Sequence, residues 1–129
     1  MLGAGWPDGA AIGLRAAGVV LGVLGALLVG WGARSLGPSL TPLPRPREGA
    51  ALAERGAYRL VRHPLYGGVL VLGLGFALAT TPLALAPVAA LAVFFSLKSR
   101  REEAWLLRAL PGYSGYAERV RRRFLPGLW

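Results

Sequence analysis

The chain has 129 residues, of which 54 % are hydrophobic, yet its formal net charge is +9. It contains no cysteine and a single histidine, His63, which excludes disulfides, thiolate chemistry and metal sites built from several histidines. A water-soluble domain of this size does not normally combine such hydrophobicity with such charge, and the order of residues along the chain explains the combination.

Two long uncharged runs dominate the chain. The first has 18 residues between Arg15 and Arg34, and the second has 34 residues between His63 and Lys98. About 20 apolar residues cross the hydrocarbon core of a bilayer, so the first run predicts one crossing. The second predicts two, because the Thr-Thr-Pro stretch at 80–82 interrupts it near its middle. A signal peptide is the alternative for the first run, but its apolar part is too long and no clear cleavage site follows.

These runs predict an all-α integral membrane protein with about three transmembrane helices in one domain, residues 1–129. A helix over 13–34 is followed by a cytoplasmic connection over 35–62, a transmembrane hairpin over 64–97 and a cytoplasmic segment over 98–129. We expect residues 37–49, with four prolines, to be irregular, and residues 50–62 to form a short helix or turn. Pro64 suits the first turn of a helix, where its missing N–H costs nothing. Residues 99–110 should be helical up to Pro111-Gly112, with a further short helix over 113–123.

The basic residues indicate the orientation in the membrane. Fourteen of the fifteen lie in two segments: Arg34, Arg45, Arg47, Arg55, Arg59 and Arg62 in the connection, and Lys98, Arg100, Arg101, Arg108, Arg119, Arg121, Arg122 and Arg123 in the C-terminal segment. Three crossings place both segments on one side, and short basic loops stay in the cytoplasm. We therefore predict a protein of the cytoplasmic (inner) membrane with its N-terminus outside. This orientation accounts for the charge without a nucleic-acid partner, and no RNA-binding motif is present.

Small residues recur every four positions on the first helix, at Gly18, Gly22, Ala26 and Gly30. Such a stripe lets a second helix approach closely. The stripe predicts either packing against the chain's own hairpin or a homodimer, and the sequence does not choose between them.

Two polar clusters flank the hairpin, and the predicted topology brings them to the same membrane face. The first runs from Gly56 to Gly68, and the second contains Glu102 and Glu103 followed by residues 113–122. Taken singly, these side chains have plain structural interpretations, as interfacial anchors, aromatic-belt residues or a solvated helix face. Adjacent residues on a helix point about 100° apart. We therefore expect one carboxylate to face a site and the other to face solvent or a basic partner.

Together the clusters resemble the isoprenylcysteine carboxyl methyltransferases and their phospholipid methyltransferase relatives. Three motifs occur in the family's order, over about residues 50–126: Arg62-His63-Pro64-Leu65-Tyr66, then Glu102-Glu103, then Tyr113 and Tyr116 with the basic stretch from Arg119 to Pro126. The resemblance implies an integral membrane enzyme that uses S-adenosylmethionine, with His63, Tyr66 and the glutamate pair in contact with that cofactor.

Chemical roles follow from the groups that the cofactor offers. Arg62 or His63 would pair with its carboxylate, Glu102 or Glu103 would accept from its ribose hydroxyls or ammonium, and Tyr66 would hydrogen-bond or stack. We expect Gly67 and Gly68 to leave room for the ligand. The predicted catalytic residues are His63, Glu102, Glu103 and Arg119. The predicted cofactor-binding residues are Tyr58, Arg62, His63, Tyr66, Gly67, Gly68, Glu102, Glu103 and Tyr116.

The acceptor is expected to be lipid-like, because an amphiphile can diffuse laterally and present its headgroup to a site at the membrane surface. Its reacting group can be a carboxylate, a thiol or an amine. The rival interpretations are a small transporter subunit and a structural membrane adaptor. A transporter usually carries ionisable residues inside its spans, and neither uncharged run contains any.

Overall fold

A computed structural model describes residues 5–36, 56–110 and 112–129. Within them the chain forms four α-helices, α1 (Asp8–Leu36), α2 (Pro64–Ala79), α3 (Leu85–Ala109) and α4 (Tyr113–Arg119), and two 3-10 helices, η2 (Gly56–Arg59) and η3 (Pro82–Ala84). These residues contain no strand, which confirms the all-α fold. The proline-rich segment 37–49, and residues 50–55 of the predicted short helix, lie outside the described residues.

The helix boundaries follow local signals in the sequence. Pro64 opens α2 as predicted, and the break at 80–82 becomes a tight turn in which the Thr81 hydroxyl accepts from the backbone N–H of Leu83 at 3.2 Å. Gly112, at φ 90°, ends the helical path after α3 with a backbone angle that favours glycine. From residue 88 to Ala109 no glycine or proline interrupts α3, so the apolar part and the polar part form one continuous helix.

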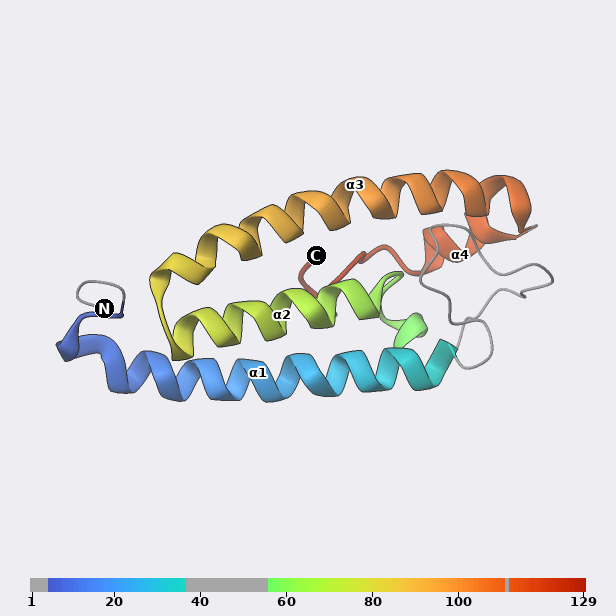
Figure 1. Ribbon diagram of the computed structural model, residues 1–129. Helices are drawn as coiled ribbons and strands as arrows, with labels where there is room; N and C mark the ends of the chain where they lie inside the picture. Colours follow the sequence, from blue (N-terminus) through green and yellow to red (C-terminus); the bar gives the residue numbers. More distant parts are fainter. Residues whose placement is uncertain (1–4, 37–55, 111) are drawn as a thin grey trace.

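Antiparallel packing of α1 on α2 forms the tightest helix contact (Figure 1). A Cβ added at Gly18 would lie 2.5 Å from the backbone oxygen of Gly75, and one at Gly25 would lie 2.4 Å from the backbone nitrogen of Leu72. The two backbones therefore touch where side chains are missing. We call this contact the glycine seam; its glycines are Gly18, Gly22 and Gly25 of α1 and Gly68 and Gly75 of α2.

The glycine seam uses only half of the predicted small-residue stripe. Gly18 and Gly22 face α2, whereas Ala26 is exposed and a Cβ at Gly30 would meet nothing within 4 Å. The true contact follows a three- and four-residue alternation that includes Gly25 rather than Ala26, because α-helical positions return to one face every 3.6 residues. Packing against the chain's own hairpin is thus one use of the stripe, and a homodimer stays a prediction.

Apolar side chains cover the outside of the helices. Residues Asp8–Ser35 and Pro82–Ala109 are each long and apolar enough to cross a bilayer, and only 11 % and 6 % of their most apolar windows are buried inside the protein. Large apolar side chains such as Ile12, Phe76 and Val93 are more than half exposed. A soluble core helix would hide such residues from water, so this exposure, together with the lengths, identifies an integral membrane fold. At 16 residues, α2 is the shorter apolar helix.

The C-terminal residues 120–129, hereafter the tail, return between α2 and α3 (Figure 1). Backbone N–H groups of Arg62 and His63 donate to the carbonyls of Arg122 and Arg123 at 3.0 and 2.7 Å. The next residue, Phe124, is fully buried in a small core with Leu70 of α2 and Phe95 of α3. The tail therefore fastens α2 to α3 at the end of the hairpin where the predicted clusters lie.

Candidate functional site

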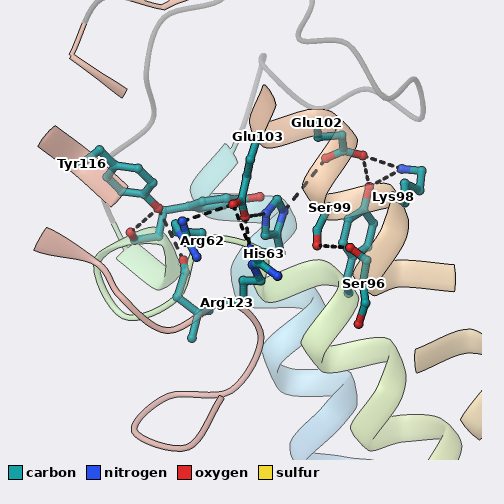
Figure 2. A network of polar contacts seen from close by, with 12 residues as sticks. Arg62, His63, Ser96, Lys98, Ser99, Glu102, Glu103, Tyr116 and Arg123 are labelled. Carbon is teal, nitrogen blue, oxygen red and sulfur yellow. Dashed lines mark hydrogen bonds and ion pairs between the residues drawn. The ribbon is translucent and has the colours of Figure 1, made fainter. Parts of the chain in front are cut away.

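A network of polar side chains forms where α2 begins, the polar half of α3 passes and the tail returns (Figure 2). We call it the polar cluster. Its members are Arg62, His63, Tyr66, Lys98, Glu102, Glu103 and Arg123. The two sequence motifs that flank the hairpin thus meet in space, as the antiparallel hairpin predicts.

Glu103 is the centre of the polar cluster. Only 7 % of the residue is exposed, and its two carboxylate oxygens receive three cationic or ionisable partners. His63 Nε2 lies 2.5 Å from Oε2, Arg62 lies 3.2 Å from Oε1, and Arg123 Nε lies 3.4 Å from Oε2. Three partners on one carboxylate hold Glu103 in a single position, since each buried charge needs compensation.

The imidazole of His63 has a defined tautomer in this arrangement. A carboxylate only accepts hydrogen bonds, so a neutral His63 must carry its proton on Nε2, where it faces Glu103. Nδ1 is then the nitrogen with a free lone pair, and it lies 4.0 Å from Glu102 Oε2. His63 also precedes α2 without its side chain capping the helix, so the ring is available for other contacts.

Glu102 forms a second group of contacts, with Tyr66 and Lys98. Its carboxylate accepts from the hydroxyl of Tyr66 and from the ammonium of Lys98, at 2.6 Å for the latter. Lys98 also contacts the Tyr66 hydroxyl and lies 4.5 Å from the centre of its ring. Tyr66 itself stacks on His63, with ring centres 5.5 Å apart, and joins the two groups. The two glutamates therefore have different partners, but neither points into solvent: their side chains are 15 % and 10 % exposed.

Three tyrosines lie at the rim of the cluster: Tyr58, Tyr113 and Tyr116. The hydroxyl of Tyr116 in α4 donates to the carbonyl of Tyr58 at 2.7 Å and lies 3.4 Å from that of Val61, so it fixes the backbone that leads to Arg62. Burial, and secondarily the charge of Glu102, raise the pKa of Tyr58 to about 12. Burial also raises the pKa of Tyr113. The phenols of Tyr58 and Tyr113 therefore stay protonated near neutral pH. They can donate hydrogen bonds, but neither can act as a base.

Two predicted site residues, Gly67 and Gly68, do not leave the space that was expected beside them. A Cβ on Gly67 would lie 1.9 Å from the carbonyl oxygen of Phe124, and one on Gly68 would lie 2.7 Å from the side chain of Val29. The chain itself fills the space beside both glycines, which allow the tail and α1 to approach rather than leave room for a ligand. Arg119 is exposed at the last turn of α4, and its catalytic role stays a prediction.

Lys98 and Arg123 are two members that the sequence motifs did not single out. Lys98 stands four residues before Glu102, a spacing that places opposite charges on one helix face and that signals this pair. Arg123 belongs to a run of three arginines that resembles headgroup-binding charge, and no local pattern marks the one that turns toward Glu103. The backbone pairing of the tail with residues 62 and 63 makes that choice.

The polar cluster has the groups that a zwitterionic ligand such as the predicted cofactor requires. Three permanent cations, Arg62, Lys98 and Arg123, face two carboxylates, so the cluster has a surplus of one positive charge with His63 neutral. The Nε atom of Arg62 is buried and has no hydrogen-bond partner among the described residues. Buried donors of this kind are uncommon in folded proteins and fit an anionic group of a ligand.

The sequence matches the pattern of one known protein family. The sequence pattern of a family described as phospholipid methyltransferase matches residues 14–111, well over half of the chain. The matched range extends from α1 to the end of α3 and includes six of the seven members of the polar cluster, all except Arg123. Comparison with curated proteins gave no match.

Proposed function

The chain belongs to the phospholipid methyltransferase family, and we propose that it transfers a methyl group from S-adenosylmethionine to the headgroup amine of a phospholipid-like amphiphile at the cytoplasmic membrane face. The observation that carries this proposal is the polar cluster, which gathers opposite charges at one end of an otherwise apolar helix bundle. An enzyme that methylates a phospholipid headgroup needs its charged groups at such an interface, where the headgroups lie.

We assign the cofactor to the same groups that the sequence motifs indicate. Arg62, with its unpaired buried Nε, and His63 would hold the carboxylate, and Glu102 or Glu103 would accept from the ribose hydroxyls or the ammonium. Tyr66 would stack or hydrogen-bond beside them. The cofactor supplies a methyl carbon already activated by the adjacent sulfonium. The protein's task is therefore mainly to align the acceptor and exclude water.

An amine acceptor must also lose a proton, and His63 is suited to take it. Its Nδ1 has a free lone pair because Nε2–H is committed to Glu103. Once Nδ1 is protonated, the imidazolium lies between the carboxylates of Glu103 and Glu102, at 2.5 and 4.0 Å, which stabilise the new charge. Glu102 is the alternative proton acceptor, although it is already paired with Lys98.

The predicted orientation belongs to this proposal, because a polar, charged methyl donor does not cross lipid cheaply. The start of α2, the C-terminal half of α3 and α4 lie toward the same end of the molecule, opposite the turn between α2 and α3 (Figure 1). That half of α3 contains Arg100, Arg101 and Arg108. We therefore place that end in the cytoplasm and the turn on the outer side, with a single domain spanning residues 1–129.

One experiment tests the activity and the orientation together. Labelled S-adenosylmethionine is added outside sealed vesicles that contain the protein and phosphatidylethanolamine, prepared in right-side-out and inverted forms. Labelled lipid should form in the inverted vesicles, and in the right-side-out vesicles only after they are permeabilised. Labelled lipid in intact right-side-out vesicles would contradict the orientation. Absence of label from all preparations, with no heat of S-adenosylhomocysteine binding, would favour a structural adaptor.

A further inference from the structure

The most weakly held cation of the polar cluster is Arg123. Its Nε lies 3.4 Å from Glu103 Oε2 and its Nη2 lies 3.5 Å from Oε1, whereas charge-assisted hydrogen bonds are normally about 2.7–2.9 Å. Each oxygen has a closer partner: Arg62 at 3.2 Å on Oε1 and His63 at 2.5 Å on Oε2. Both oxygens of the Glu103 carboxylate thus have a partner without Arg123. The guanidinium of Arg123 is therefore the cation that gives the cluster its surplus positive charge.

The backbone of Arg123 is nevertheless fixed. Its carbonyl accepts from the N–H of His63 at 2.7 Å, and the residue that follows, Phe124, is fully buried between α2 and α3. The fixed backbone keeps the guanidinium near one place beside the cluster, while its long contacts with Glu103 leave it able to bind a ligand. It is also the most accessible cation of the cluster, with its side chain 28 % exposed, compared with 14 % for Arg62 and 21 % for Lys98.

The surroundings of Arg123 indicate what kind of anion fits. The tail continues into a turn closed by bonds from the N–H groups of Phe124 and Leu125 to the carbonyl of Trp129, both at 2.7 Å. At the end of this turn Leu128 and Trp129 are 76 % and 44 % exposed. An unsatisfied guanidinium in the same short segment as exposed apolar side chains suits a phosphate that carries acyl chains better than a free phosphate in water.

We propose that Arg123 binds the phosphate of the acceptor lipid and thereby selects phosphate-bearing amines as substrates. This inference rests on the proposed function for the meaning of "acceptor", but the binding itself does not require turnover. A planar guanidinium matches phosphate oxygens with two parallel N–H donors, which lysine cannot do. In an ethanolamine phospholipid two carbon atoms separate the phosphate oxygen from the amine. Arg123 Nε and His63 Nε2 both contact Glu103 Oε2, at 3.4 and 2.5 Å, so a phosphate anchored at Arg123 would bring the nitrogen of the lipid toward the imidazole of His63.

The roles of the two arginines are then distinct. Arg62, more buried and closer to Glu103, remains with the cofactor, and Arg123 belongs to the acceptor. This division predicts that changes at Arg123 alter the use of the lipid and leave the use of the methyl donor intact. A purely structural role in holding Glu103 would affect both substrates together.

The test compares Arg123→Gln and Arg123→Lys with Arg121→Gln, an exposed arginine of the same tail that gives the same change in charge. Two acceptors are used, a short-chain phosphatidylethanolamine and an amine of equal chain length without the phosphate. We expect Arg123→Gln to raise the KM for the phospholipid about tenfold to a hundredfold, the usual loss for a hydrogen bond to a charged group. The KM for S-adenosylmethionine and for the phosphate-free amine should stay within about twofold, and Arg123→Lys should be intermediate.

Equilibrium binding of the same two lipids, without methyl donor, separates this inference from the proposed function. Binding of the phospholipid that weakens in Arg123→Gln but not in Arg121→Gln supports the inference even if no methyl group is transferred. Equal phospholipid binding by the wild-type protein and Arg123→Gln overturns it. So does a parallel loss of S-adenosylhomocysteine binding in Arg123→Gln, whether or not Arg123→Lys restores it, because that result assigns Arg123 to the support of Glu103.

Discussion

Between α1 and α2 the contact is made by backbone atoms, whereas at the start of α2 the contact with α3 and the tail is made largely by charged side chains. The glycine seam brings Gly25 within reach of the backbone of Leu72, where even one added methyl group would clash. The polar cluster instead gathers three cations and two carboxylates around His63. The same helix, α2, takes part in both.

The glycine seam and the polar cluster therefore have different tasks: the seam makes the helix pair rigid, and the cluster provides the reactive groups. In lipid no hydrophobic force draws helices together, so close packing of small residues has to hold them. At the membrane surface water competes for every charge, and a buried carboxylate persists only with several partners. Shape therefore fixes α2 against α1, while electrostatics places the functional groups at its first turn.

The largest effect should follow from removing the central charge of the polar cluster. In Glu103→Gln the two arginines lose their shared counter-charge, and breaking a buried ion pair costs several kcal/mol. We expect a loss of about 3 kcal/mol in the free energy of unfolding, at the lower end because Arg123 is partly exposed. Binding of S-adenosylhomocysteine, measured by calorimetry, should fall at least tenfold.

Two further glutamates calibrate that result. Glu102→Gln removes the partner of one cation, Lys98, and should have a smaller effect on stability. Glu118→Gln makes the same change on the exposed surface of α4 and should alter stability by less than about 0.5 kcal/mol. If thermal denaturation ranks Glu103→Gln with Glu118→Gln, the polar cluster does not hold this end of the molecule together.

The glycine seam is tested by a single added methyl group. In Gly25→Ala the new Cβ would stand 2.4 Å from the backbone nitrogen of Leu72, so the helices must separate. Overpacking of this kind costs about 1–3 kcal/mol, which thermal denaturation in detergent should show as a lower Tm. Gly30→Ala is the matched control, since its Cβ would meet nothing within 4 Å. Equal melting temperatures for the two variants would show that α1 and α2 are not in backbone contact.

The smallest effect should come from the rim of the polar cluster. Tyr116→Phe removes the hydroxyl that bonds to the carbonyl of Tyr58 but keeps the buried ring. We expect a loss of about 0.5–1.5 kcal/mol in stability, the net value of one hydrogen bond. Among the described residues the hydroxyl of Tyr113 makes no hydrogen bond, so Tyr113→Phe should cost less. The reverse ranking in chemical denaturation would show that Tyr116 does not fix the backbone before Arg62.

Much of the fold can be predicted from the sequence, because the signals that start, interrupt or end each helix are local. The uncharged runs predicted the apolar helices, Pro64 marked the start of α2, and the Thr-Thr-Pro stretch predicted the turn before α3. The continuous α3 agrees with the expectation that residues 99–110 extend the helical path up to Pro111-Gly112. A change from apolar to polar residues is no helix break when neither glycine nor proline accompanies it.

The order of the motifs likewise predicted that the start of α2 and the polar half of α3 meet, because the two ends of an antiparallel hairpin are neighbours. Which glycines form the seam, which of three successive arginines turns inward and which carboxylate receives His63 were decided only in three dimensions. Gly67 is the clearest case: its missing side chain admits the carbonyl of Phe124, 57 residues later in the chain, and not a ligand. The composition and periodicity of a segment predict whether its residues face lipid or water. The choice of partner depends on distances between segments far apart in sequence, which appear only when the helices and the tail have packed.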